Sequence, residues 1–124
     1  VYYVQYAHAR MASILRAADE KGIDFNTAAL DLLVHPKELE LIRKIIELPT
    51  VVERSAERME PHHLTHFAME LAKSLQRFYE HCRVVSSEKK DVEISKARLQ
   101  LVEAAQIALR RTLTLMGMSS PERM

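Results

Sequence analysis

The sequence contains very little glycine, one cysteine and no tryptophan. Among its 124 residues are two glycines, at positions 22 and 117, and four prolines. The chain therefore has no flexible glycine-rich loop to surround the phosphates of a nucleotide, and neither GxxxxGK[ST] nor GxGxxG occurs. These absences exclude nucleotide hydrolysis by this chain.

The single cysteine, Cys82, cannot form a disulfide within the chain, and this favours a reducing compartment, with the cytoplasm as the expected location. The sequence also lacks a signal-peptide pattern and any run of about 18 apolar residues, so we expect no membrane segment. Eighteen basic against seventeen acidic residues leave a formal charge of +1. A near-neutral chain does not coat nucleic acid by bulk attraction, and any site for a polyanion must be local.

Residues that strongly favour helix dominate the composition, and apolar residues repeat at the helical period. We expect helical segments over residues 1–21, 26–33, 36–59, 61–84 and 94–116. The third should bend near Leu48 and Pro49, and residues 86–91 should form a solvated connection. No strand pattern occurs. The prediction is an all-α helical bundle of about five helices, in one domain over residues 1–124. Because the chain begins at Val1 inside a predicted helix, we expect it to be a fragment of a longer protein.

Two groups of residues could suggest a metal site or a catalytic site, but each is better explained by a structural role. His62, His66 and Glu70 lie at i, i+4 and i+8, but no cysteine cluster or HExxH motif accompanies them, so we predict no metal site. Cys82 lies near His81, yet no oxyanion loop or orienting acid is recognisable. We predict no catalytic residue in the chain.

The segment YVQYAHAR, residues 3–10, is rich in polar-tipped aromatic and cationic side chains. Tyr3, Tyr6 and Arg10 lie at i, i+3 and i+7 and flank the apolar stripe of the first helix. Both tyrosine rings could rest on the edge of the core with their hydroxyls in solvent. Alternatively, the rings form a surface on which unpaired bases stack, with Arg10 available to a phosphate or base edge. Composition does not decide between these two interpretations.

The end of the chain, MSSPERM, should turn away from the last helix. Gly117 can take the left-handed conformation that closes a helix, and Pro121 disfavours helix in the residue before it. We expect an ordered hook held by ion pairs of Glu122 and Arg123 and by packing of Met118, which leaves Met124 free.

Four stretches together resemble a known family: YYVQYAHARMASILRAA, LQRFYEHCRV, ARLQLVEAAQIALRRTLTLMGM and the terminal SSPERM. They closely resemble the C-terminal, all-helical anticodon-binding domain of arginyl-tRNA synthetases, which are class I enzymes. The resemblance covers nearly the whole chain in the right order, although residues 23–60 carry no signature.

This resemblance implies a role in gripping the anticodon stem and loop of tRNA(Arg) during translation. The parent protein would be an arginine–tRNA ligase whose missing catalytic domain uses ATP with magnesium, and the fragment itself would hold no cofactor. The partners implied are the tRNA and that catalytic domain, and no oligomer is expected. His8 is expected to form a structural hydrogen bond at the junction with the missing domain. The residues that the resemblance assigns to the anticodon loop are Tyr3, Tyr6, Arg10, Tyr79 and Met124, with Arg83 as an additional candidate.

The alternative is a helical module for protein interaction, in which the tyrosine face packs against a partner helix. Binding to RNA should weaken steeply with salt because counterions are released from phosphates, whereas an apolar helix interface should not respond in this way.

Overall fold

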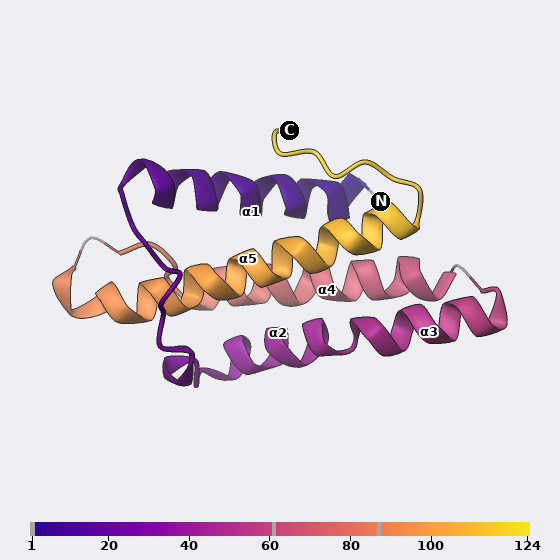
Figure 1. Cartoon of the computed structure of the whole chain (residues 1–124), viewed down its shortest axis with the longest axis horizontal. Coiled ribbons are helices and arrows are strands. Elements are labelled where there is room, and N and C mark those ends of the chain that lie inside the picture. The colour runs from indigo at the N-terminus through magenta and orange to yellow at the C-terminus, as the bar shows by residue number, and fades with distance from the viewer. Residues whose placement is uncertain (1, 61, 87) are drawn as a thin grey trace.

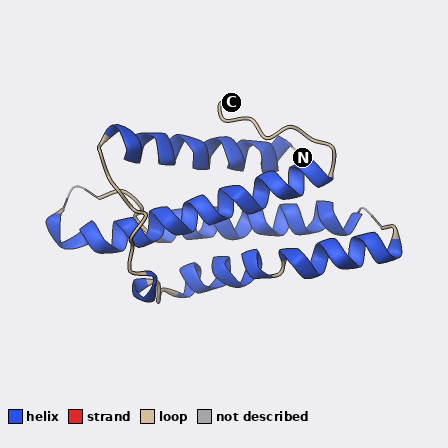
Figure 2. Ribbon diagram, in the orientation of Figure 1, coloured by secondary structure: helices blue, strands red, loops and turns tan. Residues whose placement is uncertain are grey.

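A computed structural model describes residues 2–60, 62–86 and 88–124, and the regular elements in these ranges are all helical (Figure 2). None of these helices combines the length and apolar character that a membrane crossing requires. The prediction of an all-α bundle of about five helices is therefore confirmed. The helices are α1 (Tyr2–Glu20), α2 (Pro36–Ile46), α3 (Leu48–Arg58), α4 (His62–His81) and α5 (Val92–Leu115), with short 3-10 turns η1 (Leu30–Leu32) and η2 (Lys89–Asp91).

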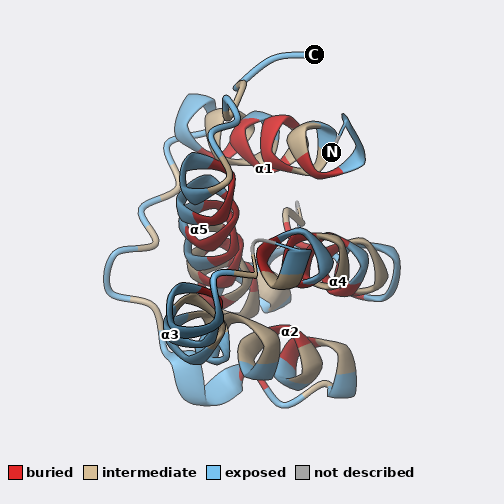
Figure 3. Ribbon diagram, turned by 90° about the vertical axis from the view of Figure 1, so that its right-hand side faces the viewer, coloured by how far each residue is buried: buried red, intermediate tan, exposed pale blue. Residues whose placement is uncertain are grey.

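Helices α4 and α5 form the centre of the bundle. Helix α1 packs on both of them, and α2 also contacts both, on the other side of the bundle from α1 (Figure 1). The buried faces of the helices point towards one another (Figure 3). The apolar stripe predicted for the first helix lies on this inner side, since Val4, Met11 and Ala18 are buried.

Two glycines end helices at the positions that the sequence predicts. Gly22 and Gly117 have φ angles of 71° and 74°, a conformation that residues with a Cβ rarely adopt. Beyond Gly117, the backbone N–H of Met118 donates to the carbonyl of Leu113 at 2.8 Å, the arrangement of a Schellman motif. This turn redirects the chain out of α5 and back towards α1.

The structure corrects one predicted element and confirms another. The helix expected over residues 26–33 is reduced to η1: the backbone bonds of this short segment close tight turns, such as Leu32 N–H to the carbonyl of Ala29, because so few residues gain too little to nucleate an α-helix. The bend expected near Pro49 is present as a break between α2 and α3. Pro61, where the fourth helix was predicted to begin, lies outside the described residues.

Helix α2 begins with a capping box centred on a buried carboxylate. Glu38 is 1% exposed, and its Oε1 accepts the backbone N–H of His35 at 2.9 Å. Its Oε2 accepts Nε–H of Arg98 on α5 at 2.6 Å. Arg98 Nη1 also donates to the carbonyl of Arg83 at 2.8 Å. Both carboxylate oxygens are thus satisfied, as burial requires.

A second carboxylate joins α2 to α4. Arg77 Nε donates to Glu40 Oε1 at 2.8 Å, and this hydrogen bond holds the pKa of Glu40 below its ordinary value. Because the pKa is lowered in the folded chain, the pair stabilises the fold above the ordinary carboxyl pKa. Its contribution is lost as the pH falls through the lowered value.

We expect Glu38→Ala to lower the free energy of unfolding by about 3 kcal/mol, because it leaves the Arg98 side chain, which is only 17% exposed, and a capping N–H without their partner. Glu47→Ala is the matched control, since Glu47 pairs with Lys44 at 3.0 Å on an exposed surface and should cost less than about 1 kcal/mol. Urea unfolding followed by circular dichroism measures both. Equal losses would contradict the assignment of Glu38 as the buried anchor.

Candidate nucleic-acid interface

Arg10 and Tyr79 are stacked across α1 and α4. The guanidinium carbon of Arg10 lies 4.3 Å from the centroid of the Tyr79 ring, a cation–π contact. The contact holds the long Arg10 side chain against the ring, so that its N–H groups are presented in a fixed orientation. Residues that are 69 positions apart in the sequence thus form one surface element.

Tyr6 and Tyr3 extend this element towards the start of α1. Their side chains are 46% and 41% exposed, which is high for aromatic rings on a helix that packs into a core. This exposure fits a surface on which bases stack better than it fits rings that only rest on the edge of the core. Tyr3 lies one turn before Tyr6, at the margin of the surface.

The C-terminal tail returns along α1 (Figure 1). Gln5 Nε2 donates to the carbonyl of Ser119 at 3.0 Å, and Arg16 Nη1 donates to the carbonyl of Glu122 at 3.0 Å. Between them, Nδ1 of His8 lies 2.8 Å from the carbonyl of Pro121. The predicted ordered hook is therefore present.

The groups that hold the tail differ from those that the sequence suggested. Within the described residues Glu122 and Arg123 form no ion pair, and the bonds instead go to backbone carbonyls of the tail. Met118 is exposed, whereas Met116 packs against the core. The ion-pair prediction was wrong because α1 offers donor side chains, and these bind carbonyl oxygens that every tail residue carries.

Tail and α1 enclose a hollow of about 300 Å³. It brings together Tyr6, Arg10 and Met124, three of the residues that the family resemblance assigns to the anticodon loop. Met124 is 53% exposed and ends the tail beside α1. Among the side chains of the lining three are basic, Arg10, Arg16 and Arg123, and one is acidic, Glu122. A local cationic site thus exists on a chain of nearly zero net charge.

A second hollow, of about 660 Å³, has in its lining Tyr79, on which Arg10 stacks. Tyr79 and Arg83 both line it, and Ser13 lines both hollows, whereas Tyr3 lines neither. Because Arg10 belongs to the first hollow and stacks on Tyr79 of the second, the two form a continuous surface along α1. Arg83 is exposed there, and its backbone is fixed by Arg98.

His8 lies behind this surface rather than on it. The side chain is 0% exposed, as a hydrogen-bonding structural residue requires, and its partner within this chain is the carbonyl of Pro121 in the tail. Its Nε2 is buried and has no partner among the described residues.

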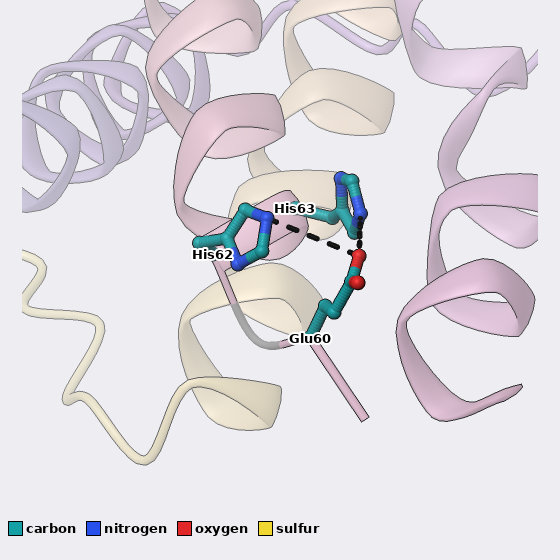
Figure 4. Close-up of side chains that lie close together, drawn as sticks. All are labelled: Glu60, His62 and His63. Carbon is teal, nitrogen blue, oxygen red and sulfur yellow. Dashed lines mark hydrogen bonds and ion pairs between the residues drawn. The ribbon is translucent and has the colours of Figure 1, made fainter. Parts of the chain in front are cut away.

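The histidines of α4 do not form the spaced cluster that the sequence contains. His66 pairs with Glu70 at 3.3 Å, whereas His62 and His63 both face Glu60, at 3.9 and 2.5 Å (Figure 4). These last three are the only group among the described residues whose ligand atoms could meet one metal ion. His62 is exposed and the other two are half-buried, and the hydrogen bond between His63 and Glu60 accounts for their proximity. We therefore assign no metal to this cluster.

Cys82 is buried, and burial raises the pKa of its thiol. A thiol that resists ionisation is a poor nucleophile. Cys82 is therefore poorly suited to act as a nucleophile.

Gln5, Ser13 and Arg16 belong to this surface although the sequence pattern did not single them out. A signal existed for two of them, since Ser13 and Arg16 continue the helical spacing of Tyr6 and Arg10 by two further steps along the same stripe. Gln5 has a role only because the tail returns to α1, and no short stretch of sequence encodes that return.

Comparison with known proteins connects this surface to a family. The family described as DALR anticodon binding domain matches residues 4–124. A protein from Dehalococcoides mccartyi named arginine–tRNA ligase is 56% identical over 124 residues, which are 100% of this chain and 22% of that protein. One of the same name from Moorella thermoacetica is 50% identical over 127 residues and is covered over 22% of its length.

A solved structure of Thermus thermophilus arginyl-tRNA synthetase has the same fold over 98% of this chain and 21% of that one, with a TM-score of 0.85 at 31% identity. The chain therefore spans about a fifth of the length of the relatives it matches.

The geometry of the tail predicts how the fold responds to shortening. Deletion of Met124 should lower the free energy of unfolding by less than about 1 kcal/mol, because the residue is exposed and makes none of the tail bonds. Deletion of residues 119–124 removes the three bonded carbonyls and should cost more, at roughly 1 kcal/mol for each bond. Urea unfolding compares the two variants. If removal of Met124 alone costs as much as the longer deletion, the last residue is a structural clasp.

Proposed function

The chain belongs to the DALR anticodon binding domain family, and from this we propose that it binds the anticodon stem and loop of tRNA(Arg) as one domain of an arginine–tRNA ligase. The domain spans residues 1–124. Arginylation itself would use ATP with magnesium in the part of the parent protein outside this sequence, and this domain would help to select the tRNA in the cytoplasm. No oligomer is needed for this role.

The observation that carries the proposal is the surface shared by Tyr6, Arg10, Tyr79 and Met124. Residues from the start of α1, the end of α4 and the last position of the chain meet around two adjoining hollows. We infer that Tyr3 and Arg83 contact the loop at the margins of this surface.

The chemistry of the surface suits an unpaired RNA loop. Exposed aromatic rings accept the faces of bases, and a stacked guanidinium offers a planar donor fork to a phosphate or base edge. The surplus of arginine in the smaller hollow provides local attraction for phosphates. A near-neutral domain that forgoes the contacts of the rest of the enzyme should bind tRNA weakly by itself.

The direct test is binding of an anticodon stem-loop of tRNA(Arg) to the 124-residue chain at several salt concentrations, followed by fluorescence anisotropy. Each phosphate contact to a single strand contributes a slope of roughly −0.7 to log affinity against log salt. A slope steeper than about −1 corresponds to more than one such contact and supports the proposal. Saturable binding to a protein partner but not to the stem-loop would favour the alternative, a helical module for protein interaction.

We expect Tyr6→Ala to weaken binding of the stem-loop about 5- to 100-fold, since stacking on one base contributes roughly 1–3 kcal/mol. Ile46→Ala is the matched control, because Ile46 is an exposed apolar side chain on α2, on the other side of the bundle. Tyr6→Phe should be mild. If Tyr6→Ala and Ile46→Ala bind alike, Tyr6 does not contact RNA.

The substitution Arg10→Lys tests whether Arg10 acts through its charge or through the planar shape of its guanidinium. Lysine keeps the charge but loses the planar fork that stacks on Tyr79, so we expect a clear loss of affinity, about fivefold or more. Arg58→Lys, on the exposed face of α3, should leave binding unchanged. Should Arg10→Lys bind like the unchanged chain while Arg10→Ala fails, Arg10 supplies only general attraction.

A further inference from the structure

We propose that His8 is a positioning residue for RNA recognition, which acts by fixing the C-terminal tail as the second wall of the smaller hollow. This inference rests on the proposed function of the same surface. It assigns His8 no contact with RNA, because the side chain is fully buried between the core and the tail.

The chemistry of the contact fixes the state of the imidazole. A backbone carbonyl only accepts hydrogen bonds, so the His8 nitrogen 2.8 Å from the carbonyl of Pro121 carries the proton. The other nitrogen, Nε2, is buried and has no partner among the described residues, and a bare lone pair is less costly there than an unpaired N–H. The neutral ring protonated at Nδ1 is therefore the form that docks the tail.

His8 lies between two further tail bonds, and this makes it the centre of a clamp. Gln5 and Arg16 of α1 bind the carbonyls of Ser119 and Glu122, on either side of Pro121. Gln5 is half-buried and Arg16 lines the hollow, whereas His8 is the buried member. A bond shielded from water is the one that solvent competes with least.

The clamp matters for recognition because it positions the last two residues of the chain. Arg123 and Met124 come directly after the last clamped residue and line the hollow opposite Tyr6 and Arg10. The final residues of a chain are normally frayed unless they are tied down. With the clamp in place, these side chains are held where a nucleotide can lie between tail and helix.

The test is a double-mutant cycle on the 124-residue chain, with stem-loop affinity as the readout. The four chains are the unchanged chain, His8→Leu, a deletion of residues 119–124, and the two changes combined. His8→Leu should weaken binding about three- to tenfold, as expected for the loss of one buried hydrogen bond. In the deleted chain His8→Leu should have no further effect, since the carbonyl that it binds is gone.

Gln5→Met provides a second cycle that does not disturb the core, and it decides the question if His8→Leu fails to fold. It should weaken binding about two- to fivefold in the full chain and not at all after the deletion. His66→Leu, an exposed histidine on α4 that pairs with Glu70, is the matched control and should bind like the unchanged chain.

Nitrogen-15 NMR of the histidine rings should find His8 neutral and protonated at Nδ1 in the unchanged chain. This signature should be lost on deletion of residues 119–124. The inference is overturned if the effect of each substitution persists after the deletion, or if the full chain tolerates both substitutions while Tyr6→Ala still weakens binding. If the unchanged chain does not bind the stem-loop, the proposed function fails instead.

Discussion

The carboxylate of Glu38 joins parts of the chain that apolar packing alone would leave free to slide. It caps α2 through His35 and binds Arg98 of α5, which in turn binds the carbonyl of Arg83. An apolar core is tolerant of small shifts, whereas a buried ion pair with directed hydrogen bonds permits one arrangement. The segment that follows the end of α4 at His81 is thereby fixed relative to α5, and the larger hollow keeps its shape.

Helix α1 combines several roles on different sides of one cylinder. Val4 and Met11 face the core, Tyr6 and Arg10 face solvent, and His8 faces the returning tail. A helix of 19 residues has room for such a division because neighbouring positions point about 100° apart. This division explains the many polar-tipped side chains of residues 3–10, because these side chains face solvent or the returning tail and not the apolar core.

The fold was largely predictable because its information is local. Helical periodicity, the glycines at helix ends and the proline between α2 and α3 are all properties of short stretches. The predicted helix over residues 26–33 was wrong, since this short segment closes tight i+3 turns in place of an α-helix. The site was predictable as a set of aromatic and basic residues on α1, and the assignment of Tyr79 and Met124 came from family resemblance. The stacking of Arg10 on Tyr79 and the clamp on the tail involve residues far apart in sequence, and no local pattern encodes such contacts.

The tail is held mainly through its backbone carbonyl oxygens, so most of its side chains take no part in the attachment. Every amino acid carries a carbonyl, so Glu122 can be exchanged for another residue while the bond from Arg16 persists, whereas Gln5 also donates to the hydroxyl of Ser119 at 3.2 Å. Side chains at the last positions can then be altered without a new way of docking them. The side chains of residues 122–124 can therefore vary while the tail keeps its place against α1.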